Sequence, residues 1–101
     1  MLLRIEFDCD ADIINVPPYV IEHKDSFRAK FLKWIRNKNN DPHRHKTHTT
    51  KTGKKYTVVC YRADAFVEWL NQKIIHDADE KASIIATRID KYDEDIPAIF
   101  F

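Results

Sequence analysis

The residues best suited to chemistry gather in one short stretch of this chain, from residue 43 to residue 56. Lysine and arginine side chains are interspersed there with threonine hydroxyls, and the stretch ends at one aromatic ring. The cations and the aromatic residue are Arg44, Lys46, Lys51, Lys54, Lys55 and Tyr56. Cationic side chains neutralise phosphates, hydroxyls position a sugar-phosphate backbone, and a tyrosine ring stacks on a base. The stretch therefore predicts binding of nucleic acid, with RNA or a single strand preferred.

Three of the five histidines, His43, His45 and His48, lie in the same stretch and allow a second interpretation. An imidazole changes its charge near neutral pH, so it can take the proton of a ribose hydroxyl while a lysine stabilises the charged phosphate. A metal-independent ribonuclease would use His45, His48, Lys54 and Tyr56. No sequence feature orients any of these against a second acid-base group, so we expect binding rather than catalysis.

The sequence offers little to a metal ion or a cofactor. The arginine and lysine neighbours of the three histidines repel a cation. The run Asp-Cys-Asp-Ala-Asp at residues 8–12 has the spacing that opens a calcium-binding loop, but Ile13 and Tyr19 stand where that loop needs a glycine and a glutamate. The single glycine, Gly53, leaves no material for a glycine-rich phosphate loop. We expect neither metal nor cofactor.

The net charge of +1 hides a strong segregation of charge along the chain. Residues 24–55 hold eleven lysines or arginines and two aspartates, a local balance of +9, whereas residues 1–23 and residues 56–101 each carry −4. The field of such a basic segment, rather than the net charge, steers an anionic partner. That partner is a nucleic acid in the first interpretation. In a third, the protein is a regulator or inhibitor that binds an acidic protein.

The segment from residue 25 to residue 37 has the period of a helix with two unlike faces. Its large apolar residues share one face: Phe27, Phe31, Trp34 and Ile35. Cations share the opposite face: Lys30, Lys33 and Arg36. We expect the apolar face to turn inward, so that the three cations extend the predicted binding surface.

Periodicity and turn signals predict strands and helices in alternation. In chain order they are a strand at 3–7, the helix at 25–37, a hairpin at 44–62 that turns at Thr52 and Gly53, a helix at 63–75, a strand at 82–89 and a short strand at 96–101. The order β-α-β-β-α-β with an extra C-terminal strand is that of an α+β, ferredoxin-like domain. The alternative is a winged-helix-like domain with the hairpin as its wing.

The 101 residues and 12.0 kDa fit a single domain over residues 1–101. No apolar run is long enough to span a membrane, and Cys9 and Cys60 occur without an export signal, so we expect a cytoplasmic protein with no membrane partner. The apolar residues at 96–101 must dock on the fold or form an interface. If they form an interface, the protein is a homodimer that associates through this last strand.

Overall fold

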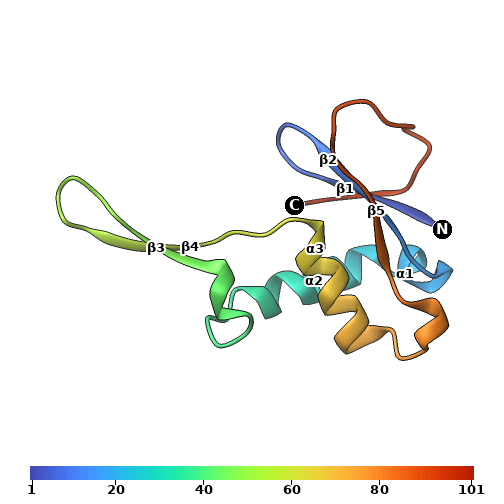
Figure 1. The fold of residues 1–101 in the computed structure, drawn as a ribbon, viewed down its shortest axis with the longest axis horizontal. Coiled ribbons are helices and arrows are strands. Elements are labelled where there is room, and N and C mark those ends of the chain that lie inside the picture. Colours follow the sequence, from blue (N-terminus) through green and yellow to red (C-terminus); the bar gives the residue numbers. More distant parts are fainter.

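The computed structural model describes all 101 residues as an α+β fold built on one four-stranded sheet. β1 (Leu2–Glu6) and β2 (Ala11–Asn15) form an antiparallel pair at its centre. β5 (Ser83–Ile89) adds antiparallel to β2, and β6 (Ala98–Phe100) adds parallel to β1. The strand order is therefore β5-β2-β1-β6 (Figure 1).

Helices cover one face of this sheet (Figure 1). They are α1 (Pro18–Glu22), α2 (Lys24–Ile35) and α3 (Ala63–Trp69), which continues into a π-helical turn at Leu70–Ile74, with short 3-10 turns at Pro42–Arg44 and Ala78–Glu80. Pro18 suits the first position of α1 because its ring fixes φ at a helical value. An N–H at this position would have no partner within the helix, so its absence costs nothing. None of these helices combines the length and apolarity needed to cross a bilayer.

The core lies between the sheet and the helices. Leu3 and Ile5 of β1 share a face with Ile14 of β2, because alternate residues of a strand point to the same side. All three are fully buried against a cluster that includes Phe31 of α2 and Phe66 of α3. Burial of these large apolar side chains supplies the main driving force for the fold.

The apolar C-terminal segment docks into this core. The centroid of the Phe101 ring lies 5.5 Å from that of Phe31 and 5.6 Å from those of Tyr61 and Phe66. Ile99 of β6 is buried beside them. Residues 96–101 therefore dock on the fold, which is one of the two outcomes expected for them.

The opposite face of the sheet carries a polar contact with the loop between β5 and β6. The Arg4 guanidinium lies 4.5 Å from the centroid of the Tyr92 ring and donates a hydrogen bond of 3.0 Å to the Asp93 carbonyl. The Tyr92 hydroxyl donates to Glu6, which raises the pKa of Tyr92. The loop thus covers part of the face that the helices leave free.

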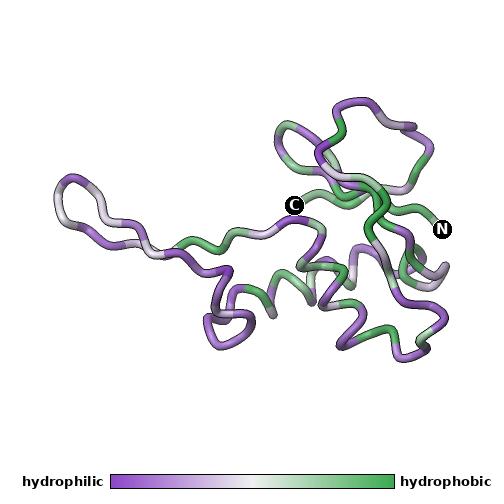
Figure 2. Tube along the Cα trace, in the orientation of Figure 1, coloured by the Kyte–Doolittle hydropathy of each residue, from purple (hydrophilic) through white to green (hydrophobic).

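A second, two-stranded sheet projects from the body as an arm (Figure 1). β3 (His45–Thr49) and β4 (Lys55–Val59) pair only with each other, and we call residues 45–59 the arm. It makes the molecule elongated, with principal extents of 48 × 32 × 19 Å. The arm is hydrophilic along most of its length (Figure 2), and every residue from 46 to 58 is exposed.

The α+β class is confirmed, but the strand order differs from the ferredoxin-like one. β2, which was not predicted, takes the place beside β1, and the predicted hairpin forms but stays outside the main sheet. The reason lies in β3, whose residues His-Lys-Thr-His-Thr include no apolar side chain to bury, as a central strand would require. The winged-helix-like alternative also places the hairpin outside the core, but it does not include the four-stranded sheet.

Candidate nucleic-acid interface

The arm has two chemically different faces, which follow from its register. His48 stands opposite Tyr56 and Lys46 opposite Val58, whereas Thr47 stands opposite Thr57. Because alternate residues point to opposite sides, the two faces carry different side chains. The ring face consists of Lys46, His48, Tyr56 and Val58. The hydroxyl face consists of Thr47, Thr49, Lys55 and Thr57.

The ring face presents a preformed aromatic platform. The His48 and Tyr56 rings are stacked, with centroids 5.4 Å apart and planes inclined by 27°. Tyr56 remains 50% exposed and the adjacent Val58 37% exposed, so one side of the platform faces solvent. Flat exposed rings beside a lysine are the groups on which unpaired bases stack.

The hydroxyl face and the tip carry groups suited to a sugar-phosphate backbone. The Thr47 and Thr57 hydroxyls lie 3.3 Å apart across the arm. At the tip, Gly53 has a positive φ of 82°, and the Thr50 hydroxyl accepts a hydrogen bond of 3.1 Å from the Lys54 N–H. This turn holds the exposed residues Lys51 and Lys54 at the outer end of the arm. Flexible cations of this kind contact phosphates and carry little sequence information.

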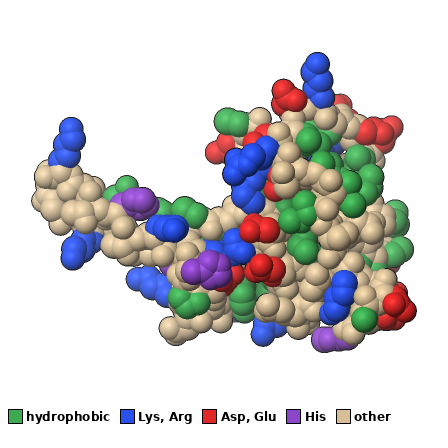
Figure 3. All heavy atoms as spheres, viewed as in Figure 1, with side chains coloured by type: hydrophobic (Ala, Val, Ile, Leu, Met, Phe, Trp, Pro, Cys, Tyr) green, Lys and Arg blue, Asp and Glu red, His purple; other side chains and the backbone are tan.

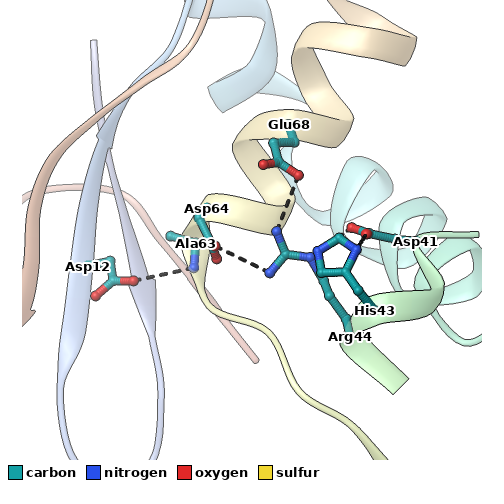
Figure 4. A network of polar contacts seen from close by, with 7 residues as sticks. All are labelled: Asp12, Asp41, His43, Arg44, Ala63, Asp64 and Glu68. Atoms are coloured by element: carbon teal, nitrogen blue, oxygen red, sulfur yellow. Dashed lines mark hydrogen bonds and ion pairs between the residues drawn. The ribbon is translucent and has the colours of Figure 1, made fainter. Parts of the chain in front are cut away.

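Arg44 ties one end of the arm to the body. We call the segments that flank the arm, Arg44 before β3 and residues 60–62 after β4, its two feet. Its side chain is 11% exposed, and its guanidinium reaches three carboxylates, with an N–O distance of 2.7 Å to Asp41 and 3.2 Å to Asp64 and Glu68 (Figure 4). Burial by itself lowers the pKa of Arg44, but the hydrogen bond to Asp41 and the charge of Asp64 outweigh it and leave the pKa raised. The backbone carbonyl of Arg44 also accepts a hydrogen bond of 2.8 Å from Cys60 N–H. Among the predicted phosphate contacts, only Arg44 forms ion pairs with carboxylates.

Arg62 anchors the second foot. Its guanidinium lies 2.8 Å from Asp10 and donates a hydrogen bond of 2.5 Å to Asp12, which is 1% exposed. The Asp12 carboxylate also accepts from the N–H groups of Ala63, at the start of α3, and Arg88, in β5. Burial tends to raise the pKa of Asp12, yet the bonds from Arg62, Arg88 and Ala63 together lower it. The sequence predictions missed Asp12 and Arg62, and their separation of 50 residues left no local signal to find them.

The exposed face of α2 lies where helical periodicity predicts it. Lys30, Lys33 and Arg36 are exposed, whereas Phe31 and Ile35 are fully buried. The helix leads through the 3-10 turn at residues 42–44 into β3, so its cations and those of the arm belong to consecutive segments.

Of the four residues considered for a ribonuclease, the structure brings together only His48 and Tyr56. His48 stacks on Tyr56, but His45 is an odd number of residues away on the same strand and points to the other face. Lys54 belongs to the tip turn. His43 lies outside the arm, with its Nδ1 2.6 Å from Asp41. The structure also contains no cluster of three or more histidine, cysteine, aspartate or glutamate side chains placed to hold a metal ion.

We found no protein family, curated protein or solved structure that matches this chain. Function must therefore be argued from the site itself, because a fold class alone does not determine it.

Proposed function

We propose that the protein binds nucleic acid, RNA or a single strand in preference to a duplex, through the arm and the exposed face of α2. One observation carries the proposal: the arm holds four lysines and no acidic residue, and it stands clear of the acidic body. Figure 3 shows basic groups along the arm and at its foot and acidic groups only on the body, which also carries basic groups. A strongly positive projection of this kind attracts a polyanion even though the whole chain is nearly neutral.

The exposure of the arm supports a bound partner. An isolated two-stranded hairpin is only marginally stable in water. This one leaves Tyr56 and Val58 exposed on its ring face. A ligand that stacks on the ring face and neutralises the lysines would cover both the apolar and the charged surface.

The preference for single strands comes from the platform of His48 and Tyr56. Bases of a single strand are free to stack on these rings, whereas the bases of a duplex already stack on each other. A two-stranded ribbon also fits the major groove of DNA, so a duplex belongs in the test.

The test is a binding assay with single-stranded RNA, single-stranded DNA and duplex DNA at several salt concentrations, in EDTA. Each phosphate contact on a single strand contributes about 0.7 to the slope of log K against log salt. We expect the double substitution Lys51→Ala with Lys54→Ala to reduce that slope by about 1.4. The matched control, Lys73→Ala with Lys91→Ala, removes the same charge from exposed positions of the body and should leave the slope unchanged.

Two outcomes would contradict the proposal. Absence of salt-dependent binding to all three ligands would remove nucleic acid as the partner and favour the acidic protein. Cleavage of the RNA in the same tubes, lost in His45→Ala or His48→Ala, would instead favour the ribonuclease. We expect no cleavage above a heat-treated control.

A further inference from the structure

A hollow of about 440 Å³ lies at the foot of the arm. Several separate segments line it: the residue after β1, both feet of the arm, the start of α3 and the C-terminal residue. Its lining residues are Phe7, Arg44, Val59, Cys60, Tyr61, Arg62, Asp64 and Phe101. The volume falls within the range of small-molecule pockets in proteins.

The wall of the hollow is made of flat surfaces. The Phe101 ring lies 6.3 Å from Phe7 and 5.6 Å from Tyr61 between centroids, and all three rings are only partly buried. The Arg62 guanidinium lies 4.1 Å from the centroid of the Phe7 ring. Aromatic rings and guanidinium planes are the two protein surfaces on which an unstacked base packs.

The charges around the hollow favour a neutral occupant. Both of its arginines are already paired, Arg62 with Asp10 and Asp12, and Arg44 with Asp64 and two further carboxylates. A phosphate would find no free cation and would be repelled by the half-exposed Asp64 carboxylate. A base carries no charge and has polar edges.

The hollow is continuous with the arm. Val59 is the last residue of β4, Cys60 and Tyr61 follow it, and Arg44 directly precedes β3. A strand whose phosphates lie along the lysines of the arm would therefore reach the hollow at its inner end. Resting on the proposed function, we infer that the hollow takes one unstacked base of the bound single strand.

The two cysteines allow a direct test. Both are exposed and free, but only Cys60 lines this hollow, whereas Cys9 lines a different one. The experiment attaches a bulky maleimide to Cys60 in the Cys9→Ser protein; the matched control attaches it to Cys9 in the Cys60→Ser protein. The ligands are a single DNA strand of about twelve nucleotides, the RNA strand of the same sequence, and a DNA strand of equal length without bases.

We expect the label on Cys60 to weaken binding of the intact strands by fivefold or more, which is about the lower limit for one stacked base. The label on Cys9 should change nothing, and the abasic strand should bind the two labelled proteins equally. A second measurement needs no labelled complex: the intact strand should slow the reaction of Cys60 with maleimide, and the abasic strand should not.

The outcomes separate the two levels of the proposal. Tighter binding of intact than of abasic strands, unaffected by the label on Cys60, would overturn the base site and leave binding by the arm, with stacking on its ring face, in place. Equal weakening of both strands by that label would also overturn it, because the label would then act on the backbone path. Binding of no strand even at low salt would refute the proposed function itself.

Discussion

Replacing Asp12 by asparagine should destabilise the protein by about 3 kcal/mol, although the side chain keeps its size. Asp12 Oδ1 accepts hydrogen bonds from Arg62 (2.5 Å) and from the N–H of Arg88 (2.9 Å), and Oδ2 accepts from the N–H of Ala63 (3.3 Å). In Asp12→Asn one oxygen becomes an NH₂ group, which cannot accept; with that group at the Oδ2 position, the Ala63 N–H loses its acceptor. A buried unsatisfied donor costs about 1–3 kcal/mol, and replacing the charged acceptor of the Arg62 bond by a neutral one adds about 1 kcal/mol.

The effect should depend on pH in a defined direction. The folded protein holds the pKa of Asp12 below its ordinary value of about 4. A carboxylate with a lowered folded pKa contributes its stability above the unfolded pKa and loses it as the pH falls through the folded pKa. The difference in unfolding free energy between the natural chain and Asp12→Asn should therefore be complete at pH 7 and shrink below about pH 4.

Urea denaturation at pH 7 and near pH 3 measures this difference. With a slope of about 1.5 kcal/mol per molar urea, the loss moves the midpoint by about 2 M at pH 7. Asp10→Asn is the matched control because Asp10 faces the same Arg62, is 22% exposed and forms no well-aligned hydrogen bond through the oxygen of its ion pair. It should cost less than about 1 kcal/mol. Equal losses for the two variants, or a gap that persists in acid, would refute the reasoning.

Three further substitutions test other parts of the structure. Gly53→Ala places a side chain at φ 82° and should cost the arm about 1 kcal/mol, seen as faster amide exchange in the arm with no change in global unfolding. Phe101→Ala removes a half-buried ring from the aromatic core and should cost about 2 kcal/mol, which thermal unfolding would show as a midpoint lowered by about 10 °C. Glutamate at Lys30, Lys33 and Arg36 together should leave the far-UV spectrum intact and weaken nucleic-acid binding; loss of the helical signal would show that this face is needed for folding.

The elements with a clear period could be predicted from the sequence, and their arrangement could not. The helical spacing of Phe31 and Ile35 correctly gives the buried face of α2. β2 was not predicted because Ile13 and Ile14 are both buried, one on each face of the sheet, and so do not show the alternation of a half-exposed strand. The hydrophilic composition of β3 was noticeable, but only the structure shows that it excludes the hairpin from the main sheet.

The candidate site divides in the same way. Exposure of Lys51 and Lys54 follows from their place beside a turn glycine. The ion pairs of Arg44 do not follow from the sequence, because two of its partners, Asp64 and Glu68, lie 20 and 24 residues further along the chain. Composition identifies which residues are cations, whereas the tertiary fold determines which of them are left unpaired.

The arm contributes none of the sixteen residues of the hydrophobic core cluster. It is tied to the body only at its inner end, by the ion pairs of Arg44 and Arg62 and by the packing of Val59 and Tyr61 against the core. Substitutions, insertions or deletions between residues 46 and 58 therefore carry little cost to the folding of the body. The body is in effect a scaffold on which a hairpin of different length and chemistry could evolve, with a new specificity and an unchanged core.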